Sequence, residues 1–172
     1  LYYRWKPTDY ESITGTLDEF PKDNRDVVSL PGEASVTYLV KNHQGTVLTK
    51  KTADEAYLIF ELAACAGNAR VDWKEKIRAK STPQTDADNP FPSKVEVWVK
   101  DERIATLDLP DDPADYRGIL SNIFGQAPPS SYGYIHKIPV PKEILGKDAP
   151  FKVEVKTAPG TQGGLRVFGG AS

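Results

Sequence analysis

A pair of alternating segments in the second half of the chain constrains its fold more than any other feature. Residues 94–100 alternate apolar and polar side chains, and residues 104–109 alternate again after the polar stretch 101–103. A period of two places every second side chain of a β-strand on the same face. The segment therefore predicts a β-hairpin with one buried face, in which residues 101–103 turn the chain.

Several other segments predict short strands, because each is rich in β-branched and aromatic residues and is bounded by turn-forming residues. Residues 53–66 are ambiguous, since Ala-Asp-Glu-Ala favours a helix whereas Tyr-Leu-Ile-Phe favours a buried strand. We expect a strand there, because the run is short and Gly67-Asn68 follows it as a turn. The predicted strands outside the hairpin are 35–40, 46–50, 56–63, 69–78, 132–140, 151–156 and 163–168.

The segments between these strands are expected to be irregular. Residues 1–30 have no clean period and predict an irregular lead-in whose aromatic side chains pack onto the domain. Residues 81–93 and 110–131 predict two long loops, with a turn of helix at 119–124. Near-regular short strands with almost no helix predict one all-β domain over residues 1–172, an antiparallel β-sandwich of jelly-roll type.

Composition bounds the function classes. A net charge of −2 gives no positive field for a phosphate backbone, so nucleic acid is not an expected partner. No apolar run approaches the roughly 20 residues of a membrane span, so we expect no membrane insertion. The chain has one cysteine, which excludes an intrachain disulfide, and no methionine, so we expect a processed protein or a piece of a longer one.

Catalytic and metal-binding signals are weak. No nucleophile elbow, Ser/His/Asp set or glycine-rich phosphate loop is present. The acidic stretch around Asp111 and Asp112 is interrupted by prolines and predicts a solvated loop, so we predict no catalytic residue. Calcium prefers clustered oxygen ligands, and the candidates for a structural calcium ion are Asp86, Asp88, Asp111 and Asp112. We expect no other cofactor.

Aromatic and polar residues of the loops indicate sugar recognition. Aromatic ring faces stack against pyranose C–H groups, and polar side chains bond the hydroxyls. We predict that two loops and a strand converge on a rim that carries the carbohydrate-binding residues Tyr116, Arg117, Tyr132, Tyr134 and His136, with Trp5 as an outer candidate. For Trp73 and Trp98 we expect core packing, and a contribution from a sheet face is the alternative.

Four segments together resemble a known family. They are the hairpin Val-Glu-Val-Trp-Val-Lys-Asp-Glu-Arg-Ile-Ala-Thr-Leu from Val95, the strand Tyr-Gly-Tyr-Ile-His-Lys-Ile-Pro-Val-Pro from Tyr132, Phe-Lys-Val-Glu-Val-Lys from Phe151, and Gly-Leu-Arg-Val-Phe from Gly164. Their order is similar to that of galactose-binding-like jelly rolls appended to polysaccharide-active enzymes. The arrangement also resembles the C-terminal domain of rhamnogalacturonan lyases. The resemblance spans residues 57–168 and implies an extracellular, carbohydrate-associated role, with catalytic residues in another domain.

We therefore expect a secreted, non-catalytic carbohydrate-binding module that recognises a polysaccharide. We expect a catalytic domain to lie next to it in the same parent chain. Two alternatives remain open. One is a small polysaccharide lyase or hydrolase in which His136 or Tyr134 acts as the base and Arg117 steadies a uronate carboxylate. The other is a structural accessory domain whose sheet packs on a catalytic neighbour.

Overall fold

A computed structural model describes residues 6–17, 26–40, 55–64, 93–109, 133–144, 150–161 and 163–169. Within these ranges the chain forms nine strands and no helix, and hence no helix that is long and apolar enough to cross a membrane. The strands are β1 (Ser12–Thr14), β2 (Val27–Leu30), β3 (Ser35–Val40), β4 (Tyr57–Ala63), β5 (Ser93–Val99), β6 (Glu102–Leu109), β7 (Tyr134–Pro139), β8 (Phe151–Thr157) and β9 (Leu165–Phe168).

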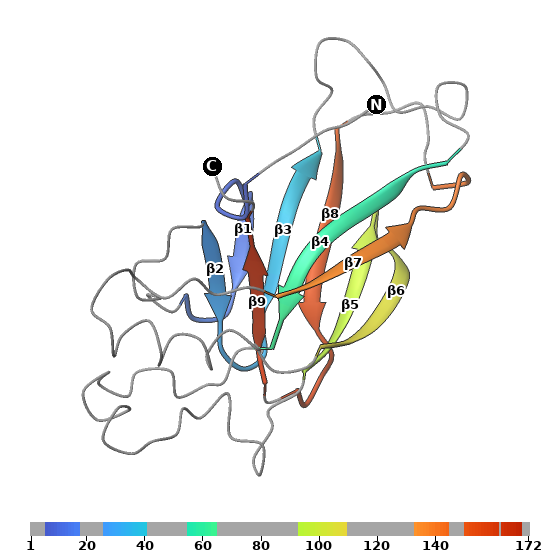
Figure 1. Ribbon diagram of the computed structural model, residues 1–172. Coiled ribbons are helices and arrows are strands. Elements are labelled where there is room, and N and C mark those ends of the chain that lie inside the picture. Colours follow the sequence, from blue (N-terminus) through green and yellow to red (C-terminus); the bar gives the residue numbers. More distant parts are fainter. Residues whose placement is uncertain are drawn as a thin grey trace, which may run out of the picture.

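The strands form two antiparallel sheets that face each other as two layers (Figure 1). The five-stranded sheet has the order β1-β3-β8-β5-β6, and the four-stranded sheet has the order β2-β9-β4-β7. Apolar side chains of both inner faces form one core between the layers, among them Val36, Tyr38, Val97 and Val155 from one sheet and Leu30, Phe60, Leu62 and Val167 from the other. The predicted all-β, antiparallel β-sandwich is confirmed.

The ambiguous segment 53–66 contains the predicted strand. Leu58, Phe60 and Leu62 of β4 are buried, whereas Tyr57 and Ile59 between them are exposed. A period of two is incompatible with a helical stripe, so burial of every second side chain selects the strand. The predicted strands 35–40, 132–140, 151–156 and 163–168 are likewise found, as β3, β7, β8 and β9.

The prediction that residues 1–30 form an irregular lead-in is wrong for two stretches, which form the strands β1 and β2. Strand β1 pairs with β3, and β2 pairs with β9, so that Val28 and Leu30 belong to the core. Both strands are too short to show a period, and their conformation is set by pairing with a neighbouring strand, β3 for β1 and β9 for β2. The Tyr38 hydroxyl also donates a buried hydrogen bond of 3.0 Å to the carbonyl of Pro7, which anchors the start of the described chain.

The β5–β6 hairpin is confirmed, but its turn lies earlier than the sequence predicts. Val99 pairs with Glu102, so the loop consists of Lys100 and Asp101 alone. Both have positive φ angles, 51° and 66°, as a two-residue type I′ turn requires. The predicted strands 46–50 and 69–78 and the helical turn at 119–124 lie outside the described residues.

Candidate functional site

The outer face of the five-stranded sheet presents Trp98 to solvent. Val95, Val97 and Val99 of β5 are fully buried, whereas the side chains between them point outward. Trp98 is therefore half-buried on a polar face, in phase with Glu96. The expectation that Trp98 packs in the core is wrong, because the valines on either side of it take the inward positions of the strand.

A β-bulge brings Arg103 beside Trp98. Val97 pairs with Ala105, but Trp98 pairs with Arg103, so β6 carries one extra residue, Ile104, at this point. If the register of Val97 and Ala105 continued without the bulge, Trp98 would oppose Ile104, and Arg103 would oppose inward-facing Val99. The bulge therefore turns the guanidinium onto the face that carries the indole ring, as bulges generally re-aim side chains.

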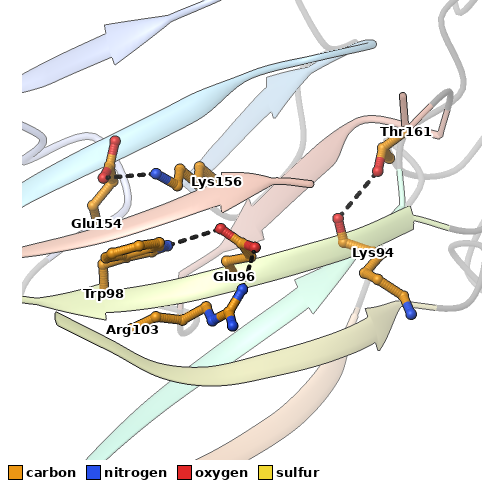
Figure 2. A network of polar contacts seen from close by, with 7 residues as sticks. All are labelled: Lys94, Glu96, Trp98, Arg103, Glu154, Lys156 and Thr161. Carbon is orange, nitrogen blue, oxygen red and sulfur yellow. Dashed lines mark hydrogen bonds and ion pairs between the residues drawn. The ribbon is translucent and has the colours of Figure 1, made fainter. Parts of the chain in front are cut away.

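Glu96 connects these two side chains. The Trp98 indole Nε1–H donates to Glu96 Oε2 at 3.0 Å, and Arg103 Nη1 donates to Glu96 Oε1 at 2.9 Å (Figure 2). The hydrogen bond from Arg103, followed by that from Trp98, holds the pKa of the Glu96 carboxyl below its usual value. Glu96 is thus an ionised acceptor that fixes the ring and the guanidinium relative to each other.

Strand β8 contributes the second side of the site. Lys156 Nζ lies 4.2 Å from the centroid of the Trp98 ring, a cation–π contact, and 3.9 Å from Glu154 Oε2 (Figure 2). At the far end of β5, Lys94 Nζ lies 3.5 Å from Asp108 Oδ1, and its carbonyl accepts a hydrogen bond from the Thr161 hydroxyl. Three pairs of opposite charge therefore lie on this face: Glu96 with Arg103, Glu154 with Lys156, and Asp108 with Lys94.

Two of the sequence-predicted site residues lie in the described strand β7. Tyr134 pairs with Leu62 and His136 pairs with Phe60, so both occupy the side of β7 that faces the other sheet. Tyr134 is nevertheless 38% exposed, at the start of the strand. His136 Nε2 is buried without a hydrogen-bond partner in the described part of the chain, and burial holds the pKa of the imidazole below its usual value.

The remaining predicted site residues, Trp5, Tyr116, Arg117 and Tyr132, lie outside the described residues, as do the calcium candidates Asp86, Asp88, Asp111 and Asp112. The predicted convergence on a loop rim thus stays a prediction. Over the described ranges, no group of three or more His, Cys, Asp or Glu side chains is placed to hold a metal ion.

The four-stranded sheet exposes an apolar strip on its outer face. Tyr57, Ile59 and Ile135 are 41%, 59% and 75% exposed. Lys137 Nζ lies 3.9 Å from the centroid of the Tyr57 ring, and the Tyr57 hydroxyl donates to Glu55. Elsewhere on this face Ser29 and Arg166 are fully buried and bonded to each other, so the exposed strip is confined to β4 and β7.

Sequence reasoning missed the polar partners of Trp98. The alternation of residues 94–100 already places Glu96 on the same face as Trp98, and this was the signal that could have found it. Arg103 and Lys156 gave no such signal, because the bulge and the order of strands in the sheet bring them there. Comparisons with models of protein families, with curated proteins and with solved structures find no match.

The arrangement around Trp98 is suited to binding. It combines an aromatic surface, donors on Arg103 and Lys156, and acceptors on Glu96 and Glu154, all on strands of a packed sheet. Side chains on such strands are positioned more accurately than side chains on loops.

Proposed function

We propose that the protein is a non-catalytic carbohydrate-binding module that takes a polysaccharide on the outer face of the five-stranded sheet. The observation that carries the proposal is Trp98, a half-buried indole ring held on the outer face of the sheet beside the polar side chains of Glu96 and Arg103. An aromatic ring stacks against the C–H face of a pyranose, and because the Lys156 ammonium lies over one face of this ring, the sugar takes the other face. Arg103, Glu154 and Lys156 around it are donors and acceptors for the sugar hydroxyls.

The pairing of Trp98 with Glu96 supports this function, because it reduces the cost of binding. A free tryptophan side chain loses rotamer freedom when a ligand stacks on it, and that loss subtracts from affinity. The hydrogen bond to Glu96 and the contact with Lys156 already hold the ring in the unbound protein. The Lys156 ammonium lies 3.9 Å from Glu154, a distance longer than a hydrogen bond, and we assign it as a donor to a ligand hydroxyl.

The biological setting follows the resemblance to galactose-binding-like jelly rolls. We place the module outside the cell, in a parent protein that acts on a polysaccharide. The predicted rim residues Trp5, Tyr116, Arg117, Tyr132, Tyr134 and His136 and a structural calcium ion remain part of this proposal as additional contributors to ligand binding.

The test is glycan binding by the wild type and by Trp98→Thr, which keeps a good strand-forming residue. Affinity electrophoresis against a panel of soluble polysaccharides should show retardation of the wild type and loss of retardation in Trp98→Thr. Ile59→Thr, at an exposed position of the other sheet, is the matched control and should bind normally. If the wild type is not retarded by any glycan, the proposal is wrong.

A structural accessory role is a second candidate, favoured by the apolar strip of Tyr57, Ile59 and Ile135. A single residue that is 75% exposed is ordinary on a surface, but here three exposed apolar side chains lie on two adjacent strands, with Lys137 opposite Ile59 and Glu61 opposite Ile135. In this case the strip packs on the catalytic neighbour, and Ile135→Ser should weaken binding of the isolated module to that neighbour. The lyase or hydrolase alternative predicts new reducing or unsaturated ends when acidic polysaccharides are incubated with the wild type.

A further inference from the structure

A row of side chains crosses the entire five-stranded sheet through Trp98. The register pairs Trp98 with Arg103 on β6 and with Glu154 on β8. Glu154 in turn pairs with Thr37 on β3, and Thr37 pairs with Ser12 on β1. Because directly opposed residues of antiparallel strands point to the same face, all members share the outer face. We call this the tryptophan row: Ser12, Thr37, Glu154, Trp98 and Arg103.

A second row runs beside the first. Glu96 pairs with Thr106 on β6 and with Lys156 on β8, and Lys156 pairs with Ser35, which pairs with Thr14. We call it the glutamate row. No member of either row is classed as buried, and apart from the Trp98 ring every side chain in both rows is polar. The two rows are two residues apart along β1, β3, β5 and β8, or roughly 7 Å, and three residues apart on β6, where the bulge adds Ile104.

The length of this double row sets the size of a ligand. Neighbouring strands are about 4.8 Å apart, so the distance from β1 to β6 is roughly 19 Å. Each pyranose ring, with its glycosidic bond, lengthens an extended sugar chain by about the distance between two neighbouring strands. An extended chain that crosses the strands therefore places about one ring over each spacing, or about four rings over the whole sheet.

The charges along the double row select against a charged ligand. On β5, β6 and β8, Glu96 is bonded to Arg103, and Lys156 lies beside Glu154, so the charges cancel locally. On β1 and β3 the row members carry hydroxyls only: Ser12, Thr14, Ser35 and Thr37. The double row itself carries two acidic and two basic groups, so its own charges sum to zero and give a polyanion no local attraction, whereas hydroxyls both donate and accept and so match sugar hydroxyls.

From this arrangement we propose that the ligand is an extended, uncharged oligosaccharide segment of about four rings that lies across the strands, along the double row. One ring stacks on Trp98, and the rings toward β1 are held by the hydroxyls of β3 and β1. This inference rests on the proposed carbohydrate-binding function and adds the direction, length and charge of the ligand.

Calorimetric titration with linear oligosaccharides of increasing length tests the inference. The probes are neutral series of gluco-, xylo- and manno-oligosaccharides of two to six rings, and oligogalacturonides of the same lengths. For the neutral series that binds, affinity should rise roughly tenfold between two and four rings and then level off. The oligogalacturonides should bind more weakly than neutral chains of equal length, at both low and high salt.

Two variants separate the inference from the function on which it rests. Thr37→Lys fills the row between β8 and β1 with a long side chain, and its ammonium faces Glu154, so the fold is retained. It should reduce the affinity for a four-ring ligand to that for two rings, roughly tenfold, and leave the two-ring affinity unchanged. Trp98→Thr should abolish binding at all lengths. Melting temperatures of all variants verify folding.

The outcomes distinguish the two claims. If glycans bind and Trp98→Thr abolishes binding, the carbohydrate-binding function stands. In that case the inference is still wrong if any one of three results is found: affinity does not rise beyond two rings, Thr37→Lys has no effect, or uronates bind more tightly than neutral chains. If the wild type binds no member of any series, both are wrong.

Discussion

The indole Nε1–H of Trp98 donates a 3.0 Å hydrogen bond to the carboxylate of Glu96, two residues earlier on the same face of β5. The second carboxylate oxygen accepts from Arg103, so one carboxylate holds an aromatic ring and a guanidinium at once. Both hydrogen bonds are made to an ionised acceptor, which makes them stronger than bonds between neutral groups. The orientation of the ring on the sheet surface therefore depends on the charge of Glu96.

Replacing Glu96 by Gln should loosen the ring while keeping the shape of the side chain. The neutral amide accepts one hydrogen bond less strongly and cannot hold both partners, so glycan affinity should fall by roughly three- to tenfold. Because the side chain lies on the outer face, the melting temperature should change little. Tryptophan fluorescence anisotropy should show greater ring mobility.

Asp108→Asn is the matched control, since it removes a carboxylate from an exposed pair with Lys94. An unchanged affinity in Glu96→Gln would show that the ring needs no such anchor.

The turn at Lys100 and Asp101 offers a stabilising substitution. Both residues adopt positive φ angles, which cost non-glycine residues free energy in the native state. Asp101→Gly relieves this cost at a position that type I′ turns commonly give to glycine, so the free energy of unfolding should rise by roughly 0.5–1 kcal/mol. Urea denaturation measures the change. Gly160→Ala is the opposite control: its φ is 79°, so alanine there should destabilise. A lower stability for Asp101→Gly would contradict the I′ assignment.

The fold was predictable from the sequence where strands are long enough to show a period. The alternation of residues 94–100 and 104–109 led to β5 and β6, and burial of every second residue from Leu58 confirms β4. Strands β1 and β2 were missed, because three or four residues cannot establish a period and pairing with β3 and β9 determines them. The position of the turn was missed too, because no glycine marks the positive φ angles of Lys100 and Asp101.

The candidate site was only partly predictable for a different reason. Local sequence determines which residues of one strand share a face, and this information was present for Glu96 and Trp98. The site, however, is assembled across β6, β5 and β8, and β8 follows β5 by more than fifty residues. The pairing of Trp98 with Arg103 further depends on a bulge that shifts the register by one residue. Neither the order of strands in a sheet nor a bulge is encoded in the period of a single segment.

Removing the hydroxyl of Tyr38 should weaken attachment of the N-terminal segment. The hydroxyl is buried and donates to the Pro7 carbonyl, and burial raises the pKa of Tyr38 far above its usual value, so the group stays a donor at any accessible pH. Tyr38→Phe leaves that carbonyl without its partner and should lower the free energy of unfolding by about 1–2 kcal/mol. Hydrogen exchange at Asp9 and Glu11, whose amides bond the carbonyls of Lys6 and Thr37, should accelerate. Amides of β5 should be unaffected, and equal acceleration there would indicate global rather than local loosening.

Acid should destabilise the protein through His136. Burial holds the pKa of this imidazole below its usual value of 6.5 in the folded state, so the native protein binds fewer protons than the unfolded chain. As the pH falls through 6.5, the unfolded chain takes up a proton that the native state resists, and the free energy of unfolding decreases. His136→Leu, which suits the inward position opposite Phe60, should therefore lose less stability than the wild type between pH 7.5 and about pH 5.5.

His43→Gln, at the only other histidine of the chain, is the control and should keep the wild-type decrease in stability that is due to His136. Urea denaturation at each pH measures the difference, and parallel profiles for wild type and His136→Leu would contradict a buried, neutral imidazole.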